Sequence, residues 1–279
     1  MDLSIIIVNY NGAPFIQGCL DSVFGSHTHH GYEVIIVDNA SRDGSVPILR
    51  ACGHPITLIE NATNVGFSAA NNQGVAQSTG RYIFLLNNDT VVESDTIQCL
   101  LDYFTGHSDV GIVAPQLLNR DGSLQGHGSG LMKWRYSGKK AIEVSFVTGA
   151  AMMVSREVYL RVGGLDENYF FYNEDLDFCK MIQKLGYSII YLPSARLTHF
   201  GGLSTATRKR ESIVEGYRGG LYFCKKHYGS SVYILYRFIL FFDLIPRYLM
   251  NRIFGRDQSA LAYLDIMKLT ILGEVGRRV

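Results

Sequence analysis

The feature that most constrains the fold is a series of short apolar runs that alternate with amphipathic stretches. Two of these runs, Leu3–Val8 and Glu33–Val37, contain the segments SIIIV and VIIV, in which no charged residue interrupts the pattern. Such runs are typical of strands that are covered on both faces of a parallel sheet. Further strands are predicted at Ile56–Glu60, Arg81–Leu86, Gly111–Ala114, Ala150–Val154 and Ser188–Leu192. The sequence therefore predicts an α/β fold that is Rossmann-like, with a mainly parallel central sheet.

Helices are predicted between the strands. The apolar residues of 15–24 fall on one helical face, and those of 97–104 do the same. A helix should also start near Ser155 and break at Gly163-Gly164, and another should run from about Glu174 to Leu185. Residues 115–146 are rich in glycine and polar side chains, so we expect a long loop or hairpin there. In such sheets, ligands bind beside the carboxyl ends of the strands.

The charges divide the chain into two parts. Over all 279 residues, 26 basic and 25 acidic residues give a formal net charge of +1, which argues against a nucleic-acid-binding protein. Residues 1–199, however, hold 13 basic and 19 acidic residues, whereas residues 200–279 hold 13 and 6. We interpret the basic C-terminal part as a region that meets an anionic surface, and a membrane is the natural candidate.

The segment 232–250 has the composition of a membrane-surface helix. It is mostly apolar but is interrupted by Arg237, Asp243, Pro246 and Arg247, so no uncharged run approaches the roughly 18–20 residues of a spanning helix. Aromatic and aliphatic side chains interleaved with arginine are typical of helices that lie in the bilayer interface. A core helix or a dimer contact in a homo-oligomer is the alternative interpretation.

Cysteine usage and the N-terminal segment bear on location. The five cysteines are widely spaced, without the CxxC pairs typical of metal sites, and we expect reduced thiols. The first apolar run is too short for a signal peptide and lacks a basic leader. We therefore expect a cytoplasmic protein that is peripheral at the inner face of the cell membrane.

Polar residues follow four of the predicted strands. The clusters are Asn9-Tyr10-Asn11-Gly12, Asp38-Asn39-Ala40-Ser41, Asn64-Val65-Gly66-Phe67 and Asn87-Asn88-Asp89. Each cluster alone is explained by turn chemistry, because Asn, Asp and Gly are favoured in turns. Four clusters at one edge of a sheet are better explained by a ligand rich in hydrogen-bonding groups. Asp89 follows an otherwise apolar strand, so it is placed to offer a carboxylate oxygen to Mg²⁺ or Mn²⁺.

Two later segments carry further candidates. Glu174 and Asp175 begin a predicted helix, where acidic residues also stabilise the helix dipole without any functional role. The preceding stretch 166–173 is polar and aromatic, which favours a functional role for this pair. His199 follows a strand-like stretch and precedes Gly201-Gly202, and a lone histidine in such a place is more often structural than functional.

Together, these segments resemble the inverting glycosyltransferases of family 2, and most closely their rhamnosyltransferase-like branch. The motifs that carry the resemblance span residues 2–204, and their order and intervals are highly specific. They are SIIIVNYNG, VIIVDNASRDGS, NATNVGFSAANNQG, YIFLLNNDT, FVTGAAMMVSREVYLRVGGLDENYFFYNEDLDFCKMIQKLGY and LTHFGG. The resemblance implies a GT-A fold for residues 1–204, with the basic and aromatic residues 205–279 as a C-terminal helical appendage.

The resemblance also assigns roles to individual residues. It implies that Asp38 holds the base of a nucleotide, and that six further residues line the nucleotide and sugar pocket: Val8, Asn9, Tyr10, Asn64, Gly66 and Asn88. It implies that Asp89 and His199 bind a divalent cation, Mg²⁺ or Mn²⁺, and that Asp175 is the general base. The chain departs from the family at Asn87, which stands where a DxD metal motif has its first aspartate.

The implied activity is an inverting transfer of a sugar from a nucleoside-diphosphate donor. The acceptor would be a hydroxyl of a saccharide or lipid-linked saccharide in cell-surface polysaccharide synthesis. On branch resemblance alone, dTDP-rhamnose is the first-choice donor, and a UDP-sugar is the alternative. The rival from another class is a nucleotide-sugar-binding protein that has lost catalysis, which the reduced Asn87-Asn88-Asp89 motif suggests. A nucleotidyltransferase is disfavoured, because no Gly-rich basic loop follows the first strand.

Overall fold

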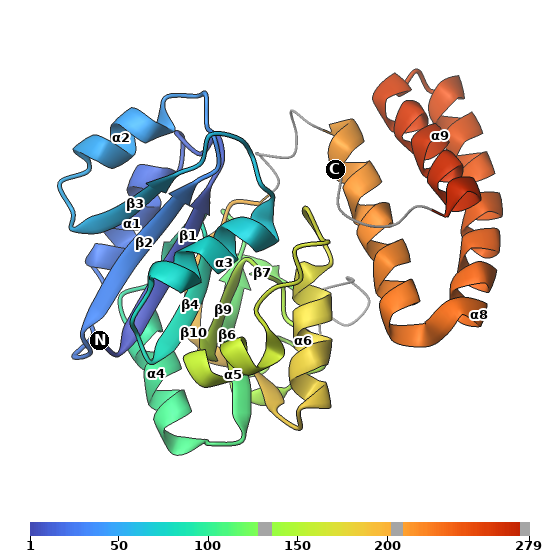
Figure 1. Ribbon diagram of the computed structural model, residues 1–279. Helices are drawn as coiled ribbons and strands as arrows, with labels where there is room; N and C mark the ends of the chain where they lie inside the picture. Colours follow the sequence, from blue (N-terminus) through green and yellow to red (C-terminus); the bar gives the residue numbers. More distant parts are fainter. Residues whose placement is uncertain (128–135, 202–208, 274–279) are drawn as a thin grey trace. The chain divides into compact units, whose positions relative to one another are not determined.

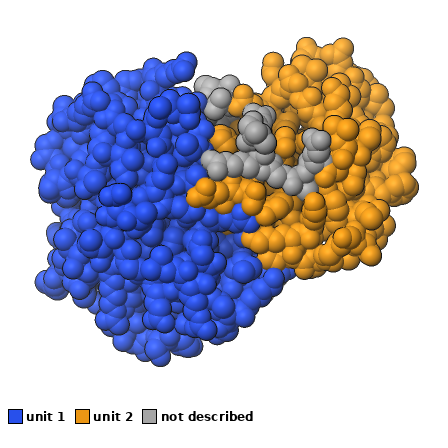
Figure 2. Space-filling view, viewed as in Figure 1, with its two compact units in different colours: residues 1–166, 175–201 blue, residues 167–174, 202–279 orange. Residues whose placement is uncertain are grey.

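The protein forms two compact units in the computed structural model, which describes residues 1–127, 136–201 and 209–273 (Figure 2). The first unit comprises residues 1–166 and 175–201, and the second comprises residues 167–174 together with the described residues after 201. The boundary that we predicted between residues 204 and 205 lies outside the described residues, as does part of the loop predicted over 115–146.

The first unit is built on one central sheet, and its parallel half forms from the predicted strands (Figure 1). β1 (Leu3–Asn9) pairs in parallel with β2 (Tyr32–Asp38) on one side and with β4 (Tyr82–Asn87) on the other. β3 (Ile56–Glu60) extends the sheet beyond β2 in the same direction. The predicted strands of this half are confirmed, each to within about one residue of its expected ends.

The other half of the sheet mixes strand directions. β9 (Ala151–Ser155) runs antiparallel to β4 and to β6 (Val110–Leu118), whereas β10 (Ser188–His199) runs parallel to β6. The remaining strands are short and antiparallel to their partners: β5 (Thr90–Val92) and β8 (Ile142–Glu143) pair with β10, and β7 (Leu124–Gln125) pairs with β6. The predicted α/β fold with a central sheet is confirmed, but the sheet is mixed: β1, β2, β3, β4, β6 and β10 run in one direction, and β5, β7, β8 and β9 run in the other. The chain after β6 returns as a hairpin.

Helices cover both faces of this sheet. One apolar core contains residues from α1 (Ile16–Phe24), α2 (Ser45–Ala51) and α4 (Thr96–Gly106). The core on the opposite face contains residues from α3 (Phe67–Gln77), α5 (Arg156–Val162) and α6 (Glu174–Lys184). Along β1, Ile5 and Ile7 belong to the first core and Ile6 to the second. Because successive side chains of a strand point to opposite faces, a strand covered on both sides is apolar throughout.

The second unit is helical, as predicted for the C-terminal region. α8 (Lys209–Ile253) is broken at Gly229, whose φ of 80° lies in the left-handed region that favours glycine. The chain reverses direction at this break, and α9 (Asp257–Leu272) then follows (Figure 1). The two parts of α8 and α9 share one apolar core, in which Leu221, Leu244 and Ile266 are fully buried.

The short segment 167–174 belongs to this second unit. Asn173 Nδ2 donates to the backbone oxygen of Gly216 in α8 at 2.9 Å. The ring of Tyr169 packs edge-on against that of Tyr222, with 5.0 Å between the ring centroids. The C-terminal unit therefore includes the residues that lead directly into α6.

Candidate functional site

The candidate site lies at the carboxyl ends of β1, β2 and β4. After β1 the chain builds β2 and β3 on one side, and then crosses to place β4 on the other side of β1. Ligands of open α/β sheets bind at such a reversal of strand order, outside the carboxyl ends of the strands. Asn9 ends β1, Asp38 ends β2 and Asn88 follows β4, so three of the predicted polar clusters meet at this point.

Asn9 connects these clusters. Its side chain is fully buried, and its Nδ2 donates to Asp38 Oδ1 at 2.7 Å and to Ser45 Oγ at 2.9 Å. Its Oδ1 accepts a hydrogen bond from Asn88 Nδ2 at 2.8 Å. Glycine is required at position 12 beside this contact, because a Cβ atom on Gly12 would collide with both amide groups. Asn9 therefore fixes Asp38 and Asn88 relative to one another.

Both carboxylate oxygens of Asp38 accept hydrogen bonds from neighbouring residues. Oδ1 accepts from Asn9, and Oδ2 accepts from the backbone N–H of Ser41 at 2.9 Å. The residue is only 2% exposed, so its hydrogen bonds satisfy a carboxylate that is nearly removed from water. A carboxylate fixed in this way keeps its remaining lone pairs in one orientation, which suits recognition of N–H donors.

Asn39, for which no role of its own was predicted, holds the neighbouring loop. Its Nδ2 donates to Asn64 Oδ1 at 2.9 Å and to the backbone oxygen of Gly66 at 3.1 Å. Its Oδ1 accepts from the backbone N–H of Val65 at 3.0 Å. Asn39 is 2% exposed and follows Asp38 directly, so its place in the same polar cluster was the available signal. The predicted residues Asn64 and Gly66 thus share one buried partner.

Two further predicted residues lie at the end of β1. Val8 packs in a small apolar cluster with Val37 of β2 and Ala70 of α3. Tyr10 directly follows the strand and is half-buried. Both residues adjoin Asn9, so their positions are set by the same strand end that orients Asp38.

Asp89 and His199, which we predicted to bind a cation, lie side by side. Asp89 lies in the two-residue link between β4 and β5, and His199 is the last residue of β10, where it pairs with Thr90 of β5. The backbone N–H of Phe200 donates to the backbone oxygen of Asp89 at 2.9 Å, which ties the two strand ends together. His199 Nε2 lies 3.3 Å from Asp89 Oδ1, and both side chains are largely buried.

Gln125, for which the sequence indicated no role, orients His199. His199 Nδ1 lies 2.7 Å from Gln125 Oε1, and this oxygen only accepts, so Nδ1 carries the proton of the hydrogen bond. Nε2 therefore faces the Asp89 carboxylate, and a cation that both groups bind would stabilise this arrangement. Among the described residues, no three His, Cys, Asp or Glu side chains gather as ligands. The pair fits a divalent cation that takes its other ligands from a bound molecule.

Asp175 lies in the first turn of α6 and accepts two backbone hydrogen bonds. Its Oδ2 accepts from the N–H of Gly149 at 2.9 Å, and its Oδ1 accepts from the N–H of Leu176 at 2.8 Å. Burial raises the pKa of the Asp175 carboxyl above its ordinary value, and the two hydrogen bonds only partly oppose this shift. A carboxylate with a raised pKa is a stronger base, so the setting suits removal of a proton from a hydroxyl group.

Asp175 lies at the same sheet edge as the other candidates. The backbone N–H of Asn87, at the end of β4, donates to the backbone oxygen of Ala150 at 2.9 Å. Ala150 follows Gly149, whose N–H binds Asp175. The predicted base therefore lies beside the strand that leads to Asp89.

His127 supports the segment that binds Asp175. It is 3% exposed, its Nδ1 accepts from the backbone N–H of Thr148 at 3.1 Å, and its Nε2 lies 3.1 Å from the backbone oxygen of Pro115. Burial lowers the pKa of His127 to about 4, so the ring is neutral near pH 7. A neutral His127 fixes the backbone immediately before Gly149, which is a structural role.

The backbone that leads into α6 is strained. Tyr172 and Asn173 have φ values of 73° and 69°, in the left-handed region. This conformation is unusual for a bulky residue such as tyrosine, and it persists only where surrounding contacts hold it. Such strain is found most often at functional sites, and here it directly precedes Glu174 and Asp175.

Comparison with known proteins identifies the family to which the chain belongs and several proteins that are similar to it. Residues 4–163, more than half of the chain, match the family described as Glycosyl transferase family 2. The chain is 27% identical over 235 residues to the uncharacterized protein y4gI of Sinorhizobium fredii, covering 76% of this chain and 26% of that protein. It therefore spans about a quarter of the length of this relative.

A second relative and a solved structure are similar over most of the chain. The N-acetylglucosaminyl-diphospho-decaprenol L-rhamnosyltransferase of Mycobacterium tuberculosis is 25% identical over 239 residues, covering 73% of this chain and 77% of that protein. The structure of the mannosyltransferase PcManGT from Pyrobaculum calidifontis in complex with GDP-Man and Mn²⁺ matches with a TM-score of 0.63 at 18% identity. That match covers 97% of this chain and 86% of PcManGT.

Proposed function

Because the chain belongs to glycosyltransferase family 2 and has the GT-A fold, we propose that it transfers a sugar from a nucleoside-diphosphate donor to an acceptor hydroxyl. One observation carries the proposal: Asn9 joins Asp38 and Asn88 at the sheet edge that also holds the Asp89–His199 pair. A ligand for this edge must combine a hydrogen-bonding base with an anionic group near the two cation ligands. A nucleotide sugar has both.

In this proposal, the residues around β1 bind the nucleotide. Asp38 accepts hydrogen bonds from the base, since its carboxylate is held rigidly by Asn9 and Ser41. Val8, Asn9 and Tyr10 form the adjoining wall of the pocket. The remaining proposed contacts to the nucleotide and the sugar come from Asn64, Gly66 and Asn88. Preorganised contacts of this kind lower the ordering cost of binding.

Asp89 and His199 would hold a divalent cation, Mg²⁺ or Mn²⁺, together with oxygens of the donor diphosphate. Such a cation neutralises the negative charge that develops on the departing diphosphate. Asn87 supplies no charge to this site, so the carboxylate of Asp89 carries the electrostatic contribution of the motif. The similar mannosyltransferase PcManGT was solved with Mn²⁺, which supports this choice of ion.

Asp175 acts as the general base in an inverting transfer. It removes the proton of the acceptor hydroxyl while that oxygen attacks the anomeric carbon from the side opposite the departing diphosphate. Its raised pKa and its place beside β4 support this role. Proton removal by a positioned group typically contributes about 10²–10⁴-fold to the rate.

For the donor we propose dTDP-rhamnose first and a UDP-sugar second. The acceptor that we propose is a saccharide, free or lipid-linked, at the cytoplasmic face of the cell membrane. The mycobacterial relative, whose name describes rhamnosyl transfer to a diphospho-decaprenol compound, supports both choices. The basic C-terminal region supports a peripheral position at that membrane.

The experiment that tests the proposal is a thermal-unfolding screen of full-length protein against dTDP-, UDP- and GDP-sugars, each with Mg²⁺, Mn²⁺ or a chelator. A ligand at 100 times its Kd adds about 2.7 kcal/mol to the free energy of unfolding, so the true donor should stand out. Stabilisation by one nucleotide series, lost with the chelator, is expected. Equal unfolding temperatures with every nucleotide and metal would contradict the proposal.

A nucleotide-sugar-binding protein without catalysis is the second candidate function. The observation that favours it is Asn87, which lacks the charge expected in the metal motif. Slow hydrolysis of the bound donor by the purified protein separates the candidates, because only a competent site cleaves the bond to the sugar. A donor that binds tightly but stays intact, with and without candidate acceptors, would favour the second candidate.

A further inference from the structure

The part of α8 after Gly229 carries a continuous apolar surface that is open to solvent. Six large side chains on it, each between 52% and 79% exposed, recur at helical spacing: Leu235, Phe238, Ile239, Phe242, Leu249 and Ile253. We name these six residues the α8 stripe. From position 235 to position 253 the helix extends about 27 Å at 1.5 Å per residue. An exposed apolar surface of this length marks an interaction site.

The opposite side of the same helix is fixed to the second unit. Leu240 and Leu244 are buried in its core together with residues of α9. Arg237 Nε donates to the backbone oxygen of Thr270 at 2.7 Å, and its Nη2 donates to that of Ile271 at 2.8 Å. These contacts hold the helix with the stripe outward.

This arrangement favours a helix that lies along a bilayer. By length and composition alone, α8 is long and apolar enough to cross a membrane, and only 17% of its most apolar window is buried. A spanning helix, however, meets lipid or other spanning helices on all sides, whereas this one packs against helices that carry charged groups such as Asp265 and Lys268. A one-sided apolar surface is typical of helices in the plane of the interface.

Basic and aromatic side chains are exposed in the chain before and after the helical segment that carries the stripe. Lys225 and Lys226 are exposed just before the break, next to Tyr228, which is also exposed. Arg256 and Phe254 are exposed beyond the other end. Lysine and arginine at the level of the headgroups attract anionic lipids, and aromatic rings favour the same depth.

Two acidic residues in and just after the stripe-bearing part of α8, within the described part of the chain, pair with arginine. Asp243 accepts from Arg247 Nε at 2.7 Å, and Asp257 accepts from Arg252 Nη1 at 2.7 Å. The surface around the stripe therefore presents excess positive charge. Two copies of the chain that met on their stripes would bring cationic ends together in either orientation, and like charges oppose such a contact. An anionic bilayer complements both the apolar and the charged parts.

We infer that the α8 stripe inserts into the interface of an anionic bilayer, with the helix parallel to the membrane plane and its cationic ends among the headgroups. This inference rests on the proposed function in one respect: a lipid-linked acceptor lies in a membrane, which explains why the protein would work beside one. The inference goes beyond the proposed peripheral location because it names the residues that insert into the bilayer. Insertion is measured without donor or acceptor, so either idea can fail alone.

The test is sedimentation of full-length protein with vesicles of phosphatidylcholine, alone or with 30% phosphatidylglycerol. The variant Phe238→Gln/Phe242→Gln removes two exposed rings without changing charge, and its partition coefficient should fall about tenfold or more. Leu160→Gln is the matched control, because Leu160 is 61% exposed on α5 of the other unit. It should bind as the parent does. Lys225→Gln/Lys226→Gln should weaken binding to the anionic vesicles only. Added salt should likewise weaken binding of the parent protein to the anionic vesicles.

Equal binding of the parent and Phe238→Gln/Phe242→Gln would overturn the inference. So would a lipid-free dimer that this variant converts to a monomer, because the stripe would then be covered by a second copy. Thermal unfolding of each variant, with and without the best-binding nucleotide, checks folding and the donor site. Nucleotide stabilisation that is unchanged in the stripe variant would confirm that only the membrane surface was altered.

Discussion

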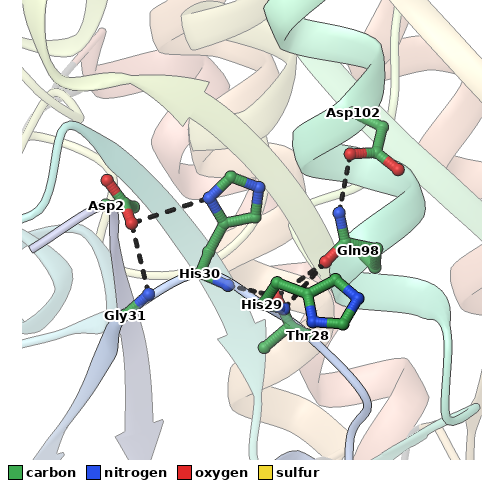
Figure 3. Close-up of polar contacts among 7 residues, drawn as sticks. All are labelled: Asp2, Thr28, His29, His30, Gly31, Gln98 and Asp102. Carbon is green, nitrogen blue, oxygen red and sulfur yellow. Dashed lines mark hydrogen bonds and ion pairs between the residues drawn. The ribbon is translucent and has the colours of Figure 1, made fainter.

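Polar residues are used in opposite ways at the two ends of the parallel strands of the central sheet. We call these the amino edge, where the strands begin, and the carboxyl edge, where they end. At the amino edge, polar side chains of a turn and of α4 bind one another near the surface (Figure 3). Thr28 Oγ1 donates to Gln98 Oε1 at 3.1 Å, and Gln98 Nε2 donates to Asp102 Oδ1 at 2.6 Å. His30 Nδ1 lies 3.6 Å from Asp2 Oδ2, and the Asp2 side chain is 54% exposed.

At the carboxyl edge, the polar groups are buried and bind across strands. Asn9, Asp38 and Asn39 are each at most 2% exposed, and Asn9, the last residue of β1, binds the last residue of β2 and the residue that follows β4. A buried polar group must be hydrogen-bonded, because leaving one unsatisfied costs about 1–3 kcal/mol. Groups at the surface exchange their partners for water at little cost. The buried hydrogen bonds therefore hold the carboxyl edge rigidly, as the proposed nucleotide site requires, whereas those of the amino edge tie the turn to α4.

The largest effect is expected for Asp175→Asn at the carboxyl edge. The amide keeps the size of the side chain but lacks a basic oxygen for the acceptor proton. Turnover should therefore fall by about 10²-fold or more, with donor affinity nearly unchanged. Steady-state rates with the identified donor and acceptor, together with donor Kd values, measure both quantities.

Glu174→Gln is the matched control for this prediction. Neighbouring residues on a helix point about 100° apart, so the two carboxylates cannot share one role toward the acceptor. We expect a smaller loss of turnover for Glu174→Gln than for Asp175→Asn. The reverse order of kcat values, in proteins with equal unfolding temperatures, would assign the base to Glu174 instead.

Asp89→Ala should abolish the metal dependence of nucleotide diphosphate binding. The substitution removes the carboxylate that, with His199, is proposed to hold the cation. Titration calorimetry with and without Mn²⁺ should show a metal-dependent affinity in the parent that the variant lacks. Asp102→Ala makes the same change at the amino edge, where the side chain is exposed, and should leave the affinity intact. Identical titrations for Asp89→Ala and the parent would remove Asp89 from the cation site.

Gly12→Ala should weaken donor binding about tenfold. The added methyl group must displace the Asn88–Asn9 contact, and an unpaired buried amide costs about 1–3 kcal/mol. Gly18→Ala in α1 is the matched control, because a Cβ there meets no atom within 4 Å. Nucleotide Kd values and unfolding temperatures report the effect. A Gly12→Ala protein that binds the donor as tightly as Gly18→Ala does would show that the Asn9 network is not needed for binding.

The pH dependence of turnover should report the raised pKa of Asp175. A base acts only when deprotonated, so the rate falls as the pH drops through the pKa of the group. Because burial raises that pKa, the acidic limb of the kcat profile should lie above the ordinary value of 3.8. In Asp175→Asn the limb should disappear from the residual activity. A limb that persists unchanged in the variant would belong to another group.

Much of the fold followed from local patterns in the sequence. The short apolar runs located the strands, because strands covered on both faces are apolar at nearly every position. No local sequence pattern indicates the direction of a strand within a sheet. The antiparallel placement of β9 was therefore not predicted. The break at Gly229 was also missed, although a glycine between two helical patterns is a recognised signal.

The site was predictable where residues follow strands, and not where contacts span long stretches of chain. Asn9 and Asp38 were found from their positions after apolar runs. Gln125 contacts His199 across 74 positions of sequence, and no local spacing reveals such a partner. The exposed side of 232–250 was ambiguous for a similar reason: the sequence shows an apolar helix, but only packing decides which of its faces the core covers.

The smallest effect is expected for Gln98→Ala at the amino edge. The substitution removes the hydrogen bonds to Thr28, to the backbone N–H of His29 and to Asp102, which lie near the surface and can be replaced by water. The free energy of unfolding should fall by about 1 kcal/mol or less, which corresponds to about 2–4 °C in a protein of this size. Nucleotide affinity and turnover should match the parent, since no strand end at the carboxyl edge is disturbed. If Gln98→Ala weakened donor binding as strongly as Gly12→Ala, the two edges would be coupled, and the division between a structural edge and a binding edge would be wrong.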